Sequence, residues 1–371
     1  MVPAIAIGEA IRRRNSDSVI LLVGSNRGIE ADLAPKAGFE LIELDVVGFP
    51  RGLGLGMIGA GWRLLRGVQR LRGIIDEFNP DVVVGTGGYV SVAAILAARL
   101  KGKPTLLQEQ NSVPGRANRL LARLADEVHI HFTEARRHFK DRGKLRLSGN
   151  PVRIRIPEGR ALKTLQKYRL YPDRKTVAVL GGSQGARSLN RAFCDMLPHF
   201  RNDRSVQFII QTGKHDYRNV LDSVRNSGAR VVVKSFINRM EEVYEVANLV
   251  VARAGAMTLA EIAACGLPSI LVPYPHATGD HQTANAHALA DKEAAVMIPD
   301  RELTGERLAE TIRGLLEGDM KLRIMGANAY ALSRPSAAKH IAEAVERLAG
   351  ASPEALLNLP EDIDVAIEEA S

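Results

Sequence analysis

Two glycine-rich turns follow apolar runs and are suited to hold a diphosphate on backbone amides. The first is "VVVGTGGYVS" at 82–91, and the second is "VLGGSQGARS" at 179–188. Where such a turn joins a strand to a helix, glycines let a ligand approach the backbone, and the helix N-terminus attracts anions. Neither turn matches G-x-G-x-x-G or a Walker loop. Each cluster alone is equally consistent with tight helix packing, but two in one chain favour a phosphorylated ligand.

A third stretch, 250–275, carries a carboxylate near the start of a predicted helix. Thr258 and Glu261 have the spacing of a capping box, so one interpretation is that Glu261 only closes the helix N-terminus. The alternative is that Glu261 accepts hydrogen bonds from the two hydroxyls of a ribose. The amides of 256–259 would then face a nucleotide. Because a carboxylate repels phosphate, the diphosphate is expected elsewhere, near 182–184.

These turns need strands that end at one edge of a sheet. Short apolar, β-branched runs alternate with longer segments of helical spacing, which is the pattern of doubly wound parallel α/β sheets. We expect strands at 19–24, 81–88, 104–109, 177–182, 207–213, 229–234, 248–255 and 268–274. Helices are expected between them at 91–101, 116–125, 258–265 and 283–291.

A pause in this alternation divides the chain into two domains, and 371 residues are enough for two cores. We place the domains at 1–150 and 170–335, with a linker at 151–170 that is rich in proline and charge. An amphipathic helix at 336–350 is expected to cross back onto the first domain, and an acidic tail follows at 351–371.

The first residues, "PAIAIGEAIRRR", already have helical spacing. A doubly wound domain normally opens with a strand, and none precedes this helix in the sequence. The first domain therefore looks truncated at its N-terminus.

Composition narrows the class of function. A formal net charge of +8 favours an anionic ligand or surface. The two cysteines have no metal-ligand spacing, which suggests the cytosol, and no run reaches the roughly 20 apolar residues of a membrane span. Nucleic acid is not an expected partner, because the arginines are not interleaved with aromatic residues in a known binding module.

Seven motifs in order carry a family resemblance across about residues 2–350. They are "GTGGYVS", "QEQN" with "GRANRLLA", "SGNPVR", "GGSQGARSLN", "SFINRM", "ARAGAMTLAEIAACGLPSILVPYP" and "DHQTANA". Together they resemble the MurG family of glycosyltransferase family 28. These enzymes are the UDP-N-acetylglucosamine:N-acetylmuramyl-(pentapeptide) pyrophosphoryl-undecaprenol N-acetylglucosamine transferases of bacterial peptidoglycan synthesis.

The resemblance implies the GT-B architecture, in which two Rossmann-like domains face each other. It implies inverting, metal-independent transfer of N-acetylglucosamine from UDP-GlcNAc to the 4-hydroxyl of the muramyl pentapeptide on undecaprenyl pyrophosphate (lipid I). No cofactor and no metal are expected. The enzyme would lie peripherally on the anionic cytoplasmic face of the cell membrane.

By the same resemblance, the donor and acceptor sites are assigned residue by residue. Ile237 would contact the uracil through its backbone, Glu261 the ribose and Gln282 the sugar hydroxyls. The residues expected at UDP-GlcNAc are Asn118, Arg153, Ser183, Ile237, Ala256, Met257, Thr258, Leu259, Ala260, Glu261 and Gln282. Those expected at the acceptor pyrophosphate are Gly87, Gly88 and Tyr89.

Two departures from the family affect the catalytic base. The family usually opens with a strand and a "GGTGGH" loop, and this sequence starts just after that point. Gln108 also stands where many members have histidine. Glu109 is the remaining candidate base, although a carboxylate paired with an arginine such as Arg116 is an equally good interpretation. Tyr89 is expected to position the acceptor.

Metal chemistry is not predicted from the remaining acids and histidines. The Asp-x-Asp triplet Asp362-Ile363-Asp364 lies in the acidic tail and is expected to be solvated. His276, His281 and His287 are expected to be polar surface. Helix N-termini, Ser183 and Arg153 would instead balance the charge on departing UDP.

Membrane contact is suggested by 57–75, "MIGAGWRLLRGVQRLRGII". One helical face would carry Ile58, Trp62, Leu65, Val68, Leu71 and Ile75, with Arg63, Arg66 and Arg70 opposite. An ordinary domain helix with its apolar stripe on the sheet is the alternative.

Three other functions stay open at this stage. The chain is also consistent with another GT-B UDP-sugar transferase or with a sugar-nucleotide epimerase of the same architecture. Because the first glycine loop is missing, an inactive UDP-sugar-binding protein is the third.

Overall fold

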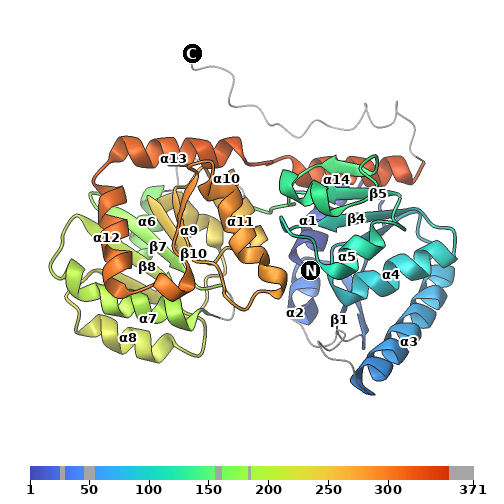
Figure 1. The fold of residues 1–371 in the computed structure, drawn as a ribbon, viewed down its shortest axis with the longest axis horizontal. Helices are drawn as coiled ribbons and strands as arrows, with labels where there is room; N and C mark the ends of the chain where they lie inside the picture. Colours follow the sequence, from blue (N-terminus) through green and yellow to red (C-terminus); the bar gives the residue numbers. More distant parts are fainter. Residues whose placement is uncertain (26–29, 46–54, 155–160, 183–184, 351–371) are drawn as a thin grey trace, which may run out of the picture.

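The computed structural model describes residues 1–25, 30–45, 55–154, 161–182 and 185–350. They form two α/β domains that lie side by side (Figure 1). All strand pairs in both domains are parallel, so the doubly wound α/β class predicted from the sequence is confirmed.

The first domain contains two parallel sheets and the helices that cover them. β1 pairs with β2, and β3 to β6 pair in chain order. The strands are β1 (Leu21–Ser25), β2 (Glu40–Leu44), β3 (Val83–Gly85), β4 (Thr105–Glu109), β5 (Glu127–Ile130) and β6 (Leu145–Leu147). The helices are α1 (Val2–Arg14), α2 (Glu30–Lys36), α3 (Leu55–Phe78), α4 (Gly88–Leu100), α5 (Arg116–Leu121) and the 3-10 helix η1 (Thr133–His138).

β4 shows how this domain is layered. All five of its residues are buried, because helices cover both faces of the sheet. Leu106 packs with Ile7 on one face, and Leu107 packs with Ile95 on the other. Successive residues of a strand point to opposite faces, so a continuous apolar run is what a doubly covered strand requires.

The second domain has one six-stranded sheet in the order β12-β11-β10-β7-β8-β9. Its strands are β7 (Lys175–Leu180), β8 (Val206–Gln211), β9 (Val231–Lys234), β10 (Leu249–Ala252), β11 (Ser269–Leu271) and β12 (Ala295–Met297). Its helices are α6 (Ala161–Tyr168), α7 (Arg187–Met196), α8 (Tyr217–Arg225), α9 (Met240–Val246), α10 (Ala256–Ala264), α11 (His281–Ala290), α12 (Gly305–Leu316) and α13 (Asp319–Ala331). Short 3-10 helices are η2 (Leu197–Phe200), η3 (Thr278–Asp280) and η4 (Asp300–Glu302).

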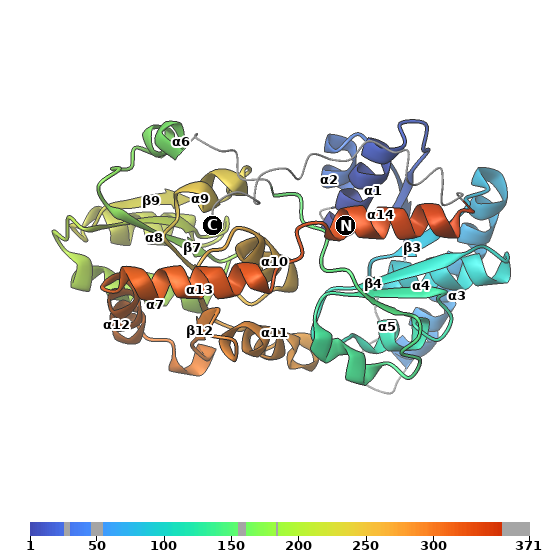
Figure 2. The same ribbon diagram turned by 90° about the horizontal axis from the view of Figure 1, so that it is seen from above.

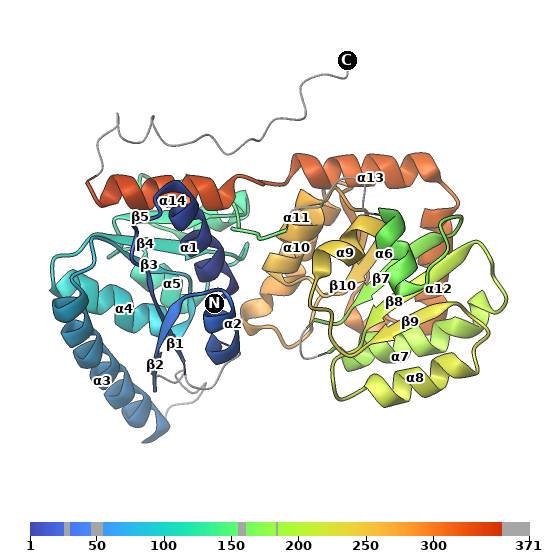
Figure 3. The ribbon, with the colours of Figure 1, turned by 180° about the vertical axis from the view of Figure 1, so that it is seen from behind.

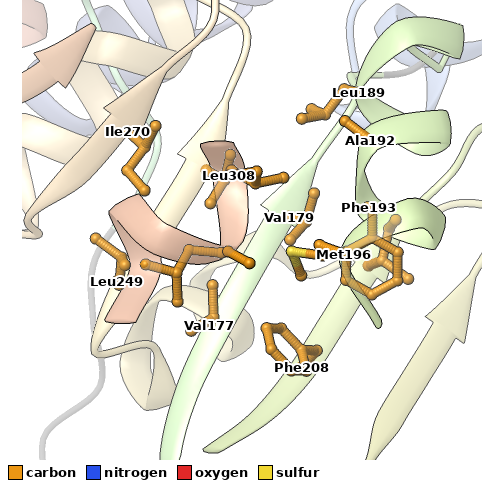
Figure 4. Close-up of a cluster of buried hydrophobic side chains, with 14 of the residues drawn as sticks. Val177, Val179, Leu189, Ala192, Phe193, Met196, Phe208, Leu249, Ile270 and Leu308 are labelled. Carbon is orange, nitrogen blue, oxygen red and sulfur yellow. The ribbon is translucent and has the colours of Figure 1, made fainter. Parts of the chain in front are cut away.

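The larger core of this domain lies between the sheet and α7, α8 and α12. Val177 and Val179 of β7 point into it, and Phe193 and Phe208 meet edge to face at 5.7 Å between ring centroids (Figure 4). Phe200 packs on Phe208 in the same geometry, at 5.1 Å. This packing fixes β7 at the centre of the sheet, where its carboxyl end is needed for the site.

The last helix, α14 (Ala337–Leu348), leaves the second domain and packs on α1 of the first (Figures 2 and 3). The buried Arg14 guanidinium bridges Glu343 at 3.3 Å and Glu346 at 3.1 Å. The chain therefore passes between the domains twice. The passages touch, because a Cβ on Gly149 (φ 101°) would lie 2.5 Å from Cβ of Arg334.

Each run expected to be a strand contains one, but four strands were not predicted: β2, β5, β6 and β12. The segment assigned as a linker also contains a helix, α6. β2 has the sequence "ELIEL" and, among the described residues, has one strand neighbour, so its two glutamates remain at the surface of an edge strand. The domain boundaries drawn from the sequence stay a prediction.

Candidate active site

The site begins where the strand order of the second sheet reverses. β7 and β10 are neighbours, and their last residues, Leu180 and Ala252, are paired. The glycine turn at 181–186 and the turn at 253–255 therefore start side by side and lead into α7 and α10. In doubly wound sheets this reversal point opens the crevice in which ligands bind, and both helix N-termini present unpaired N–H groups to it.

The glycines of the first turn serve two purposes. A Cβ on Gly181 would lie 2.9 Å from the Ala186 nitrogen, and one on Gly185 would collide with the Thr212 carbonyl. Those two positions are required by the packing of the turn itself. A Cβ on Gly182 would meet open space, so that residue faces outward. Ser183 and Gln184, also expected at the diphosphate, lie outside the described residues.

Glu261 does not cap a helix. α10 begins at Ala256 with Gly255 as its N-cap and has no side-chain capping bond, so the capping-box interpretation of Thr258 and Glu261 is wrong. Instead, Oε2 of Glu261 accepts a 3.1 Å hydrogen bond from the hydroxyl of buried Tyr244. Desolvation raises the pKa of Glu261 to about 7, and the Tyr244 bond opposes this only in part.

Met257 and Ala260 also lie on α10, which begins two residues before the helix expected at 258–265. The side chains of Ala256, Leu259 and Ala260 are buried, so only their backbone groups could contact a nucleotide. The expected ligand contacts of all these residues stay predictions.

Three further donor-site candidates already have partners. The Ile237 amide donates to Oε1 of Gln211 at 2.9 Å, and Oε1 of Gln282 accepts from the Tyr274 amide at 3.0 Å. The guanidinium of Arg153 donates to both carboxylate oxygens of Glu9 on α1, at 3.0 and 2.6 Å. These bonds orient the side chains of Gln282 and Arg153 before any ligand binds.

Glu109 lies at the carboxyl end of β4 and is 1% exposed. Its Oε1 accepts from the Asn111 amide nitrogen at 2.8 Å and from Asn111 Nδ2 at 3.2 Å, and its Oε2 accepts from Asn118 Nδ2 at 2.7 Å. The contacts that the structure gives this carboxylate are all with amides, so the alternative interpretation, a carboxylate paired with an arginine such as Arg116, is wrong. Asn118, expected at UDP-GlcNAc, therefore contacts Glu109 at the carboxyl end of β4 in the first domain.

The glycine turn of the first domain lies against Asn118, the side chain that donates to Glu109. Gly87 (φ 94°) is the N-cap of α4, and a Cβ there would be 3.6 Å from Nδ2 of Asn118. Gly88 (φ 78°) follows, and Tyr89 in the first helical turn is 36% exposed. The structure thus brings Glu109, Asn118 and the 87–89 turn together at one sheet edge.

Buried amides join the two sheet edges across the domain interface. Nδ2 of Asn150 donates to the carbonyl of Ala256 at 3.2 Å, and Nε2 of Gln108 donates to Oδ1 of Asn150 at 2.9 Å. On the other side, the hydroxyl of Ser112 donates to Oδ1 of Asn285 at 2.9 Å. The carboxyl ends of the two sheets therefore face each other. Asn150 and Asn285 were not assigned from the sequence, although both lie within the motifs noted there.

The three histidines of the second domain do not converge. His276 packs edge-on against Tyr274, His281 Nδ1 is 2.7 Å from the Thr278 carbonyl, and His287 lies beside Asp291. Across the described ranges, no group of three or more His, Cys, Asp or Glu side chains could hold a metal ion. Asp362-Ile363-Asp364 lies outside those ranges.

The predicted apolar face of α3 is divided by its packing. Val68, Leu71 and Ile75 are buried against the first domain, whereas Trp62 and Leu65 are 57% and 60% exposed. The Arg66 guanidinium lies 5.3 Å from the Trp62 ring, and the side chain of Ile58 is outside the described set. The buried part of this face is what the alternative of an ordinary domain helix predicts, and the membrane contact expected for the exposed part stays a prediction. No helix in the described parts of the chain has the length and apolar character of a membrane span.

Comparison with known proteins agrees with this arrangement. The family model for the glycosyltransferase family 28 N-terminal domain matches residues 1–130, and the model for the C-terminal domain matches 176–344. A UDP-N-acetylglucosamine--N-acetylmuramyl-(pentapeptide) pyrophosphoryl-undecaprenol N-acetylglucosamine transferase of Desulforamulus reducens is 40% identical over 93% of this chain and 95% of its own. The enzyme with the same name in Halothermothrix orenii is 38% identical over 94% and 96%.

Solved structures are also similar. The MurG of Acinetobacter baumannii has a TM-score of 0.72 at 26% identity and covers 93% of this chain and 95% of its own. A putative UDP-N-acetylglucosamine 2-epimerase of Listeria monocytogenes has a TM-score of 0.68 at 15% identity, over 98% and 97%, which shows a shared fold.

Proposed function

The chain belongs to glycosyltransferase family 28, and on that premise we propose that its two facing sheet edges hold UDP-GlcNAc and a lipid-linked acceptor. The activity is transfer of N-acetylglucosamine to muramyl pentapeptide on undecaprenyl pyrophosphate in peptidoglycan synthesis. One observation supports this use of the site most directly. The bond from Asn150, which follows β6 and accepts from Gln108 of β4, to the Ala256 carbonyl joins the carboxyl end of the first sheet to the start of α10.

The donor would bind at the β7–β10 reversal point. The diphosphate would lie on the amides that follow Gly182 and at the N-terminus of α7, which need no metal to bind an anion. Glu261 would accept hydrogen bonds from the ribose hydroxyls, and Gln282 would contact the sugar. Because its amide is bonded to Gln211, Ile237 would offer its carbonyl to the N–H of uracil.

Glu109 would act as the base on the acceptor side. It would take the proton of the 4-hydroxyl as that oxygen attacks C1 of N-acetylglucosamine, while the bond from C1 to the UDP oxygen breaks with inversion. Asn111 and Asn118 hold the carboxylate in place, so its orientation is set before the acceptor arrives. The leaving diphosphate would be stabilised by the helix amides of the second domain.

The acceptor is lipid-linked, so the first domain must reach a membrane surface. Trp62 and Leu65 are exposed on α3, and the arginines at 63, 66 and 70 are on the same helix. An aromatic and an aliphatic side chain beside basic residues suit the interface of an anionic bilayer. We propose peripheral attachment to the cytoplasmic face through this part of α3.

The test is a product analysis with purified chain, UDP-GlcNAc and a lipid-linked muramyl pentapeptide. We expect a disaccharide product and stoichiometric UDP, and no product with UDP-GalNAc as the matched donor control. Conversion of UDP-GlcNAc to its 2-epimer without acceptor would identify an epimerase instead. Binding of UDP-GlcNAc with zero turnover at saturating acceptor would identify an inactive binding protein.

A further inference from the structure

Asn285 is a buried residue of the second domain that contacts the first. It lies on α11, one turn after Gln282, and α11 lies at the border between the two domains (Figures 1 and 2). Its side chain is fully buried, and it has no role in the reaction described above. A buried amide must find hydrogen-bond partners, so the partners of Asn285 indicate what it holds together.

The Asn285 side chain uses all of its hydrogen-bonding capacity. Oδ1 accepts from the Ser112 amide nitrogen and from the Ser112 hydroxyl, each at 2.9 Å. Nδ2 donates to the carbonyl of Ala254 at 3.3 Å and to Oδ1 of Asn111 at 3.2 Å. A side-chain amide has two acceptor sites and two N–H donors, so all four are occupied. Ala254 belongs to the second domain, whereas Asn111 and Ser112 belong to the first.

Two of these partners are main-chain groups, and they fix the direction of the amide. The Ser112 N–H can only donate and the Ala254 carbonyl can only accept, so Oδ1 of Asn285 faces the first and Nδ2 faces the second. A flipped amide would place N–H against N–H and oxygen against oxygen. Asn285 therefore presents an N–H donor to Asn111.

The direction of this amide determines the direction of the next one, which contacts Glu109. Because Oδ1 of Asn111 accepts from Asn285, Nδ2 of Asn111 is left to donate, and it donates to Oε1 of Glu109 at 3.2 Å. Without Asn285, the Asn111 side chain could turn and place its own oxygen against the carboxylate. The carboxylate would then lose a hydrogen-bond donor and gain a repulsive contact.

We propose that Asn285 is a positioning residue for Glu109, on which it acts from the other domain through Asn111. This inference rests on the proposed function, in which Glu109 is the base. A base must be held in the geometry of proton transfer, so a carboxylate that is free to rotate would react more slowly. Asn285 would therefore affect turnover although it does not touch the carboxylate itself.

The same contacts link the donor side of the site to the base. Asn285 holds the Ala254 carbonyl in the turn that leads into α10, the helix expected at the ribose. It also lies on the same helix as Gln282, which is expected at the sugar. A shift of the second domain relative to the first would break the Asn285–Asn111 contact. Glu109 would therefore be held in this orientation only while the domains keep this arrangement.

The alternative role for Asn285 is packing at the domain interface. In that case, its loss would weaken the interface and lower turnover whether or not Glu109 is present. Ser112→Ala is the matched control for this role. It removes one hydrogen bond between the domains but keeps the Ser112 N–H, which fixes the direction of the Asn285 amide.

The test is a double-mutant cycle with Asn285→Ala and Glu109→Gln in the full chain. Transfer from UDP-GlcNAc to a lipid-linked muramyl pentapeptide is measured at saturating substrates. We expect Asn285→Ala to lower kcat by about tenfold or more in the natural chain, but by less than about twofold in the Glu109→Gln background. Ser112→Ala should keep kcat within about threefold of the natural value. In calorimetric titration, Asn285→Ala should change the affinity for UDP-GlcNAc by less than it changes kcat.

Each of the other outcomes contradicts a different part of this reasoning. An equal loss of kcat in both backgrounds, or an equal loss with Ser112→Ala, would overturn the proposal and leave Glu109 as the base. Undiminished turnover of Glu109→Gln would refute the base itself, and no turnover of the natural chain would refute the proposed function; either result would also remove this role of Asn285. If Asn285→Ala does not fold, Asn285→Asp replaces it in the cycle, because it keeps the acceptor for Ser112 but has no N–H for Asn111.

Discussion

Replacement of Glu261 by glutamine should stabilise the fold at alkaline pH and weaken nucleotide binding. The amide side chain would keep an acceptor for the Tyr244 hydroxyl but would remove the buried charge. Burial raises the pKa of Glu261 from its ordinary value of 4.5 to about 7. A difference of that size corresponds to about 3 kcal/mol between the charged and neutral forms.

The stability difference between Glu261→Gln and the natural chain depends on pH. Below pH 4.5 the carboxyl group is protonated in the folded and unfolded states, and the ionisation cost is absent. Between pH 4.5 and 7 the unfolded chain loses this proton first, so the stability contributed by the protonated folded form is progressively lost. Above pH 7 the folded protein bears the full cost. The stability advantage of Glu261→Gln over the natural chain should therefore grow by about 2 kcal/mol from pH 5 to pH 8.

Urea denaturation of both proteins at pH 5 and pH 8 measures this advantage, and calorimetric titration with UDP-GlcNAc measures binding. Because the ionised carboxylate is the better acceptor for ribose hydroxyls, the affinity of the natural chain should fall about tenfold from pH 8 to pH 6. The variant should bind about tenfold more weakly at pH 8 and change little with pH. A stability gap that is constant with pH would refute the burial cost. Equal affinities at pH 8 would refute the ribose contact.

Three other changes test the remaining parts of the site. Glu109→Gln should lower kcat by about 100-fold or more while UDP-GlcNAc affinity is unchanged, because the proton acceptor is lost and Asn118 can turn its side-chain amide to accept from the new NH2; a similar kcat would assign the base elsewhere. Gly185→Ala should lower the free energy of unfolding by more than about 1 kcal/mol in urea, since φ is 79° and its Cβ would meet a carbonyl. Trp62→Ser with Leu65→Ser should weaken sedimentation with anionic vesicles without a lower Tm, because both side chains are exposed, and unchanged sedimentation would argue against this membrane surface.

Much of the fold followed from local patterns in the sequence. The run at 177–180 is buried on both faces and reads as a central strand in any context. β5, "EVHI", contains a glutamate and a histidine that contact each other and also residues far along the chain. His129 contacts Ser148, and Glu127 contacts Arg347. Such a strand has no apolar run to reveal it.

The site was predictable only in part, for a similar reason. Glycine turns and the α10 region are contiguous motifs, so they were found. The start of α10 at Ala256 was not, because the Thr258–Glu261 spacing is identical in a capping box and in a helix interior. Asn285 gains its role from Ser112, which is 173 residues away, and no local pattern encodes that contact.

Because α14 returns to the first domain, this domain is formed by two segments that are not continuous in the sequence. A fragment ending near residue 150 would lack Ile341 and Ala344, which cover Ile7 and Leu106, and would expose Arg14 without its two glutamates. Such a fragment should therefore be unsuitable for studying acceptor binding in isolation. The second domain is therefore an insertion between two parts of the first domain, so we expect the two parts of the first domain to unfold together.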